Sequence, residues 1–134
     1  MTPPKAFDFE GEVAIVNGAG SRMADWEWSQ ETKRMVEEKG GTSEVIQADV
    51  TSEDSCEQAI VKTIELFGIV HVLVNIGIGR WRCDGDVIKV DLDAWDRDFR
   101  INVASMVLMC RHAIPEMRKN GRGAIVNMSS VSGL

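Results

Sequence analysis

Short apolar runs alternate along the chain with longer segments in which apolar residues recur every three or four positions. The runs, rich in Val and Ile, predict strands at 12–16, 44–48, 70–74 and 124–128. The periodic segments predict helices at 26–39, 52–67 and 92–120, each followed closely by glycine. Strands that alternate with helices in this way predict an α/β fold built on a parallel sheet.

This alternation indicates one domain, residues 1–134, with a three-layer Rossmann-like architecture. We expect a parallel sheet of about four strands, with helices on both faces and right-handed crossovers. The run 70–74 is apolar enough to be buried on both faces. No repeat, low-complexity tract or linker divides the chain.

Small polar residues and glycines follow each predicted strand. In open parallel sheets, ligands bind beyond the carboxyl ends of the strands. The segments at those ends are 17–22, 49–50, 75–79 and 129–132. Their composition suits a rim that holds phosphate and ribose groups.

Composition and charge exclude several kinds of partner. The net charge of −6 argues against nucleic acid, because phosphate binding requires a basic face. No apolar run reaches the roughly 18 residues of a membrane span, and residues 1–13 hold no hydrophobic signal core. Cys56, Cys83 and Cys110 are odd in number and widely spaced, which indicates buried thiols in a reducing compartment rather than zinc ligands. We expect a cytoplasmic protein with no nucleic-acid or membrane partner and no metal, in which His71 and His112 are structural.

Five stretches in chain order carry a resemblance to a known family. They read VAIVNGAGS, ADVTSEDS, VLVNIG, INVAS and GAIVNMSSVSGL. Together they resemble the N-terminal half of a short-chain dehydrogenase/reductase. The resemblance implies hydride transfer between a nicotinamide cofactor, NAD or alternatively NADP, and a small carbonyl or secondary alcohol.

The first stretch resembles the family's T-G-x-x-x-G-x-G turn. Gly18 matches the first glycine, where the backbone turns tightly under the pyrophosphate. Asn17 replaces the usual Thr, while Arg22 and Ala24 stand where the later glycines would be. A plain strand-to-helix turn is the alternative interpretation. The cofactor contacts that the resemblance implies are Gly18, Gly20, Ser21, Arg22, Asp25, Asp49, Val50, Asn75 and Gly77.

The segment that begins at Ala24 resembles the end of the family's second strand, which implies an internal deletion of one helix and most of one strand. Asp25 then matches the acid that accepts the ribose hydroxyls and favours NAD over NADP. One alternative is that Asp25 is an exposed carboxylate at a helix start. Another is that strand 44–48 fills the vacant slot beside the first strand and brings Asp49 to the ribose.

Two further matches also have structural alternatives. Asp49 and Val50 match the stretch that contacts adenine, but Asp49 also suits an Asx-type turn. Asn75 matches an asparagine of the family's N-N-A-G motif, although this sequence has one residue fewer there. Alternatively, the side chain of an asparagine at a strand end forms hydrogen bonds with backbone groups.

Family members use an Asn, a Ser, a Tyr and a Lys to stabilise charge on the substrate oxygen and to pass a proton to it. Asn102 matches the Asn, which holds a water and a helix kink. Ser130 matches the Ser, with Ser132 as a weaker candidate; the alternative for Ser130 is a loop hydroxyl bonded to its own backbone. The sequence contains no Tyr.

We therefore expect an NAD(P)-dependent oxidoreductase whose chain as given is incomplete, and weakly active or inactive. The alternative is a non-catalytic nucleotide-binding or dimerisation module. Helix 92–120 resembles the family's dimerisation helix and would support a homo-oligomer. The substrate is not readable from the sequence.

Overall fold

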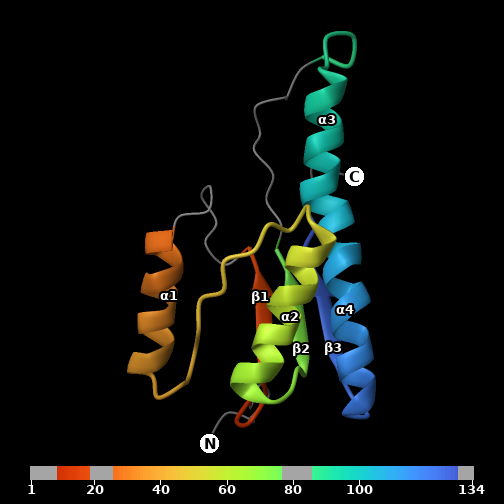
Figure 1. Ribbon diagram of the computed structural model, residues 1–134. Coiled ribbons are helices and arrows are strands. Elements are labelled where there is room, and N and C mark those ends of the chain that lie inside the picture. The colour runs from red at the N-terminus through yellow and green to blue at the C-terminus, as the bar shows by residue number, and fades with distance from the viewer. Residues whose placement is uncertain (1–8, 19–25, 77–85, 130–134) are drawn as a thin grey trace, which may run out of the picture.

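Three short strands form a parallel sheet at the centre of the protein. The computed structural model describes residues 9–18, 26–76 and 86–129. Strands β1 (Ala14–Asn17), β2 (Val72–Asn75) and β3 (Ala124–Asn127) pair in the order β1-β2-β3 (Figure 1). The expected α/β fold with a parallel sheet is confirmed, and these described residues form three strands where about four were expected.

Strand register decides which side chains face the helices. Leu73 pairs with Ile15 on one side and with Ile125 on the other, and it is fully buried. Because successive side chains of a strand point to opposite faces, these three lie on the helix-covered face. Val16 and Val126, each 45% exposed, lie on the opposite face.

Local signals set the ends of the helices. Helix α2 (Glu53–Phe67) begins where the Ser52 side chain accepts a hydrogen bond from the Ser55 N–H, and it ends at Gly68 with φ 78°. The other helices are α1 (Trp26–Glu38), α3 (Leu92–Phe99), the π-helical segment η1 (Arg100–Ala104) and α4 (Ser105–Lys119).

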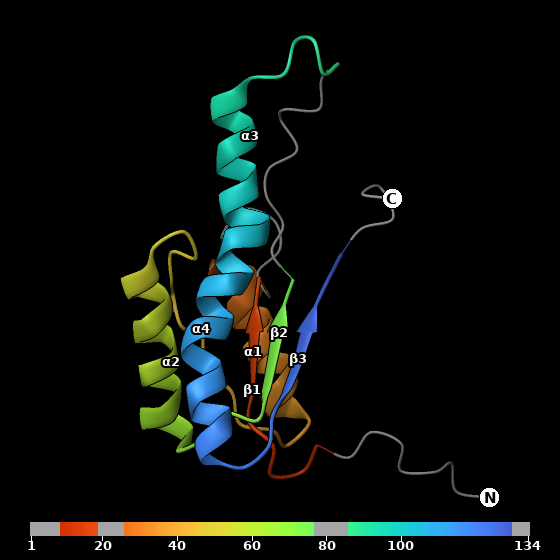
Figure 2. The ribbon, with the colours of Figure 1, turned by 90° about the vertical axis from the view of Figure 1, so that its right-hand side faces the viewer.

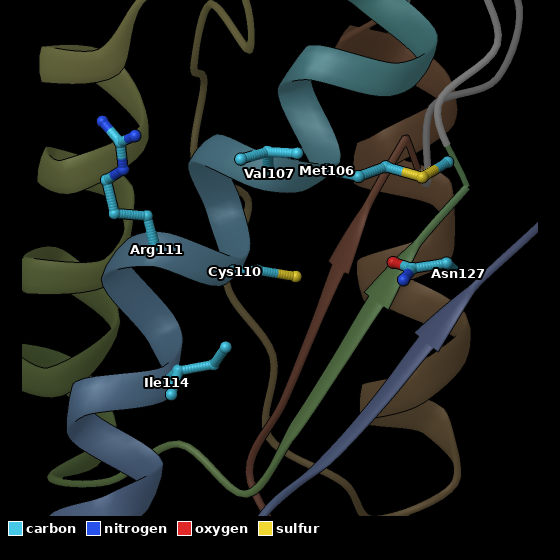
Figure 3. A pocket seen from close by; sticks show the side chains of 6 residues that line it. All are labelled: Met106, Val107, Cys110, Arg111, Ile114 and Asn127. Atoms are coloured by element: carbon cyan, nitrogen blue, oxygen red, sulfur yellow. The ribbon is translucent and has the colours of Figure 1, made fainter.

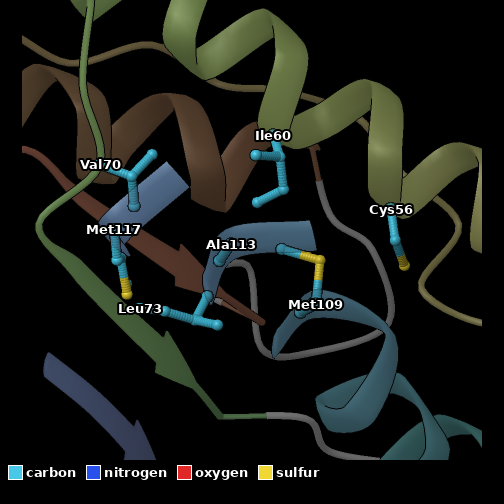
Figure 4. Close-up of a cluster of buried hydrophobic side chains, with 7 residues drawn as sticks. All are labelled: Cys56, Ile60, Val70, Leu73, Met109, Ala113 and Met117. Carbon is cyan, nitrogen blue, oxygen red and sulfur yellow. The ribbon is translucent and has the colours of Figure 1, made fainter. Parts of the chain in front are cut away.

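The hydrophobic core lies between α2, α4 and β2 (Figure 4). Its members are Cys56, Ile60, Val70, Leu73, Met109, Ala113 and Met117. On each helix they recur at intervals of four residues, which is the spacing of a buried helix face. Both helices cover the same face of the sheet (Figure 2). The expected layer of helices on the opposite face is not found among the described residues, where Val16 and Val126 are exposed.

Helix α1 stands beside the β1 edge of the sheet (Figure 1). None of its residues is buried, and Trp26 and Trp28 are more than half exposed. Lys33 of α1 pairs with Glu44 at 2.9 Å. This link holds the segment after α1 against the helix.

The strand predicted at 44–48 is absent, and this prediction is wrong. Residues 41–49 contain no regular structure, and β1 is paired with β2. A strand requires a hydrogen-bonded neighbour. The alternative in which this segment occupies the slot beside β1 is therefore wrong as well.

Within the described ranges, no helix is long and apolar enough to cross a membrane. The same part of the chain contains no cluster of three or more potential metal ligands.

Candidate cofactor-binding edge

Each of the three strands ends in an asparagine at the same edge of the sheet. Asn17, Asn75 and Asn127 are register partners across β1, β2 and β3. Backbone bonds continue past them, since Ile76 N–H donates to the Asn17 carbonyl and Met128 N–H to the Asn75 carbonyl, both at 2.9 Å. We call these three residues the asparagine row.

The asparagine row is only partly satisfied by hydrogen bonds. Asn75 is fully buried, and its Nδ2 donates to Asn127 Oδ1 at 2.8 Å and faces Cys110 Sγ at 3.8 Å. Among the residues that the structure describes, Asn17 Nδ2 and Asn75 Oδ1 are buried and have no hydrogen-bond partner. A buried amide group without a partner costs about 1–3 kcal/mol, so these two atoms are candidates to bond a ligand at this edge.

Gly18 follows β1 directly with φ 86°. Only glycine adopts this left-handed conformation without steric cost. The prediction that Gly18 makes a tight turn at the end of β1 is thus met. Gly18 and Asn75 meet at one edge of the sheet, because Asn17 and Asn75 are register partners.

Asp49 forms the Asx-type turn that was its structural alternative. Its Oδ1 accepts from the Thr51 N–H at 2.9 Å and from the Thr51 hydroxyl at 2.7 Å. These bonds hold the pKa of the Asp49 carboxyl below its usual range, with the hydroxyl as the larger cause. Val50 is half-buried and its carbonyl accepts from Cys56 Sγ at 3.6 Å. Adenine contact by either residue stays a prediction.

Asn102 lies in the π-helical segment η1, between α3 and α4. Its side-chain Nδ2 donates to the Asp98 carbonyl at 2.9 Å. Single π turns inside α-helices occur often at functional sites. The expected irregularity at Asn102 is present as this π turn. Both η1 and the start of α2 lie level with the strand tips (Figure 2).

Six predicted site residues lie outside the described residues. They are Gly20, Ser21, Arg22, Asp25, Gly77 and Ser130. Their assignments, and that of Ser132, stay predictions.

The sequence analysis placed Asn17 in the rim segment 17–22 without counting it as a cofactor contact, and it missed Asn127. A signal for them exists, because β1 and β3 have the same sequence, AIVN, and β2 reads VLVN. A polar residue that ends three apolar strands in the same way indicates one shared edge.

Known proteins give a consistent comparison. The family model described as enoyl-(acyl carrier protein) reductase matches residues 15–134. An uncharacterized oxidoreductase of Thermotoga maritima is 30% identical over 95% of this chain and 57% of its own length. The (+)-borneol dehydrogenase 2 of Salvia officinalis is 34% identical over 87% of this chain and 41% of its own. The crystal structure of an NAD⁺-bound xylitol dehydrogenase shares the fold, with a TM-score of 0.86, 23% identity, and coverage of 95% of this chain and 56% of that one.

The alignments also bear on the expected internal deletion. The match to the Thermotoga protein spans 147 positions but uses 95% of the 134 residues, about 127, so about 20 positions have no counterpart in this chain. The chain spans about half the length of the curated relatives it matches. From the family match and the 30% identical relative together, the chain belongs to the short-chain dehydrogenase/reductase family.

Proposed function

We propose that this chain, residues 1–134, is a partial Rossmann-type domain that binds a nicotinamide dinucleotide. In a complete enzyme it would serve hydride transfer between the cofactor and a small carbonyl or secondary alcohol. The relatives named as dehydrogenases support this reaction class. We also propose a cytoplasmic location with no nucleic-acid or membrane partner.

The observation that carries the proposal is the convergence of three strand tips on one edge. Gly18, with its positive φ, opens that edge for a close approach of phosphate to the backbone. Polar amides line the neighbouring tips at Asn75 and Asn127. This is the arrangement in which open parallel sheets bind nucleotides.

NAD is the proposed cofactor, with NADP as the alternative. The xylitol dehydrogenase of similar fold holds NAD⁺ in its crystal structure, which supports this choice. Asp25 is the residue proposed to accept the ribose hydroxyls, and a carboxylate there would repel the 2′-phosphate of NADP. Titration with NADH and NADPH, repeated with Asp25→Ser, tests this preference.

The chain by itself is proposed to be weakly active or inactive. Asn102 and Ser130 are the proposed catalytic residues, but the sequence contains no Tyr to act as general acid. Loss of general acid–base catalysis lowers a rate by about 10²–10⁴-fold.

A second candidate function is a non-catalytic nucleotide-binding or dimerisation module. Along α3, η1 and α4, the residues Leu92, Trp95, Phe99, Val103 and Val107 are each 45–68% exposed and recur every three or four positions. Trp95 and Phe99 stack with ring centroids 5.6 Å apart. Such a stripe favours association of this helix with a second copy.

Two glycines provide a matched test of cofactor binding. Gly11 precedes β1 with φ 78° and Gly18 follows it with φ 86°, so Gly11→Ala and Gly18→Ala impose a similar strain of about 1 kcal/mol. We expect NADH fluorescence titration to show weaker binding, by about tenfold, only in Gly18→Ala. Equal affinities of the two variants would contradict the assignment of the site. Binding without turnover of any secondary alcohol would favour the second candidate function.

A further inference from the structure

A histidine side chain replaces a backbone acceptor at the amino ends of the sheet. Val13 stands opposite His71, one position before the first register pair of β1 and β2, and its carbonyl accepts from the N–H groups of His71 and Val72 at 2.9 and 3.1 Å. In a regular parallel ladder the Val13 N–H would donate to the Val70 carbonyl. It donates instead to His71 Nδ1 at 3.0 Å, while the Val70 carbonyl accepts from Asn120 Nδ2 at 3.4 Å. This bond between the two strand segments therefore depends on the lone pair of an imidazole.

The same imidazole nitrogen has a second neighbour. Glu12 Oε2 lies 3.2 Å from His71 Nδ1, and the other oxygen of this carboxylate accepts from Arg122. A neutral Nδ1 with a lone pair can accept from the Val13 N–H but has no proton to donate to a carboxylate. A protonated Nδ1 can donate to Glu12 but can no longer accept from Val13. Because the two bonds need opposite protonation states of one atom, they exclude each other.

Charged groups reach His71 from the residues that precede β1 and β3. Glu12 belongs to the first of these segments, and Arg122 belongs to the second and bonds Glu12 Oε1. The other two neighbours named above, Val70 and Asn120, are uncharged. His71 is only 8% exposed, so a proton on its imidazole is stabilised by the Glu12 carboxylate more than by bulk water.

We propose that His71 is a proton-dependent switch between two hydrogen-bond partners at the amino ends of the sheet. In the neutral imidazole, Nδ1 accepts from the Val13 N–H and links the residues before β1 and β2. When Nδ1 takes up a proton from solvent, it donates to Glu12 Oε2 and releases the Val13 N–H. Glu12 is already within hydrogen-bond distance and Arg122 holds its other oxygen, so the exchange requires no new approach of side chains.

The switch is separate from the other features of the molecule. Val13 and His71 precede β1 and β2, whereas the asparagine row ends the three strands. A groove of about 330 Å³ beside α4 is also separate, because its lining residues include Asn127, which ends β3, whereas Arg122 precedes that strand (Figure 3). The switch therefore changes how β1 and β2 are joined, whatever the carboxyl ends of the strands bind.

Nuclear magnetic resonance of the isotope-labelled 134-residue chain tests the switch. A coupling across the hydrogen bond, between the Val13 amide nitrogen and His71 Nδ1, reports this bond directly. From about pH 8 to about pH 5, the range in which imidazoles change charge, we expect the coupling to disappear as Nδ1 becomes protonated. The protection of the Val13 amide against hydrogen exchange should fall in parallel by about five- to tenfold.

Variants distinguish the switch from a fixed structural contact. His71→Asn places an amide oxygen, which accepts but takes up no proton, near the position of Nδ1, so the protection of Val13 should stay constant over the same pH range. Glu12→Gln removes the carboxylate that receives the Nδ1 proton, so the bond to Val13 should persist to lower pH than in the unchanged chain. His112→Asn on α4 is the matched control, because this second histidine also lies near a carboxylate, Glu53, at 3.6 Å. It should leave the response of Val13 unchanged.

Four results would overturn the proposal. The first is an Nδ1 that stays in one protonation state over the whole pH range, and the second is a Val13 amide whose protection does not change while His71 titrates. The third is a pH response of Val13 that survives in His71→Asn. The fourth is an equal loss of protection at Leu73 in the middle of β2, because it would indicate general unfolding instead of a local exchange of partners.

Discussion

The two ends of the sheet are built in different ways. At the amino ends, Val13 N–H donates to His71 Nδ1 at 3.0 Å, Glu12 lies 3.2 Å from the same nitrogen, and Arg122 pairs with Glu12. These contacts join the residues that precede β1, β2 and β3. At the carboxyl ends, two buried amide atoms of the asparagine row have no partner within the described ranges. The contrast teaches that side-chain contacts join all three strands at their amino ends, while the carboxyl ends keep polar atoms that the described residues leave unpaired.

The largest expected effect comes from a charge at the carboxyl ends. Asn75→Asp places a carboxylate where the side chain is fully buried. We expect the free energy of unfolding to fall by about 3 kcal/mol or more, because the described side chains that contact Asn75 are Asn127 and Cys110, and neither carries a positive charge. Urea unfolding measures the loss, which should shrink at acid pH as the introduced carboxyl is protonated. Asn127→Asp is the control, since Asn127 is exposed; an equal loss in both variants would contradict the burial argument.

A smaller effect is expected at the amino ends. His71→Leu removes the acceptor of the Val13 N–H, and the side chain is only 8% exposed. We expect a loss of about 1–3 kcal/mol in the free energy of unfolding, from an unpaired backbone donor. NADH affinity should stay at the level of the unchanged chain, provided that the titration is done where the variant is folded. Weaker NADH binding in folded His71→Leu would contradict the view that the amino ends stabilise the sheet while the carboxyl ends bind the cofactor.

The smallest effect concerns the turn before α2. The pKa of Asp49 is lowered in the folded state by the Thr51 hydroxyl and N–H, so its stabilising contribution is present above the unfolded pKa. That contribution is lost as pH falls through the folded pKa. Thr51→Val removes the hydroxyl donor, so the free energy of unfolding should fall less steeply below about pH 4 than in the unchanged chain. The difference in this free energy should be under about 1 kcal/mol, because the Asp49 carboxyl is exposed. Urea midpoints measured from pH 6 to pH 2 test this; parallel curves would refute it.

Amide hydrogen exchange compares the protection of the edge strand β3 with that of β2. An edge strand with four exposed residues should have weakly protected amides, and residues 124–128 of the free chain should exchange faster than residues of β2. Hydrogen-exchange mass spectrometry measures both segments in one experiment. Strong protection of residues 124–128 in the free chain would contradict this expectation.

Much of the fold was predictable from local patterns. The runs at β1, β2 and β3 were identified from their Val and Ile content, and Gly68 correctly marked the end of α2. The run 44–48, EVIQA, also contains Val and Ile but forms no strand. Composition reports whether a segment suits a sheet, whereas pairing depends on a neighbour that lies elsewhere in the chain.

The candidate site was predicted in part, for a similar reason. Gly18 and Asn75 were correctly placed at one edge, because parallel strands bring their carboxyl ends together. Asn17 was placed in the rim segment but not among the cofactor contacts, and Asn127 was missed, since the pattern alone does not show which asparagines share an edge until the register is known. The π turn at Asn102 also depends on how α3 joins α4.

The sequence by itself determined the family, the parallel α/β class and the caps that begin and end α2, because each is signalled by short local patterns or by the order of such patterns along the chain. Only the tertiary structure decided the strand order, the irregular path of residues 44–48 and the asparagine row. Asn75 and Asn127 stand 52 positions apart in sequence, yet their side chains meet at 2.8 Å. Contacts of that kind follow from strand register, which is set by the packing of Leu73 and its neighbours beneath α2 and α4.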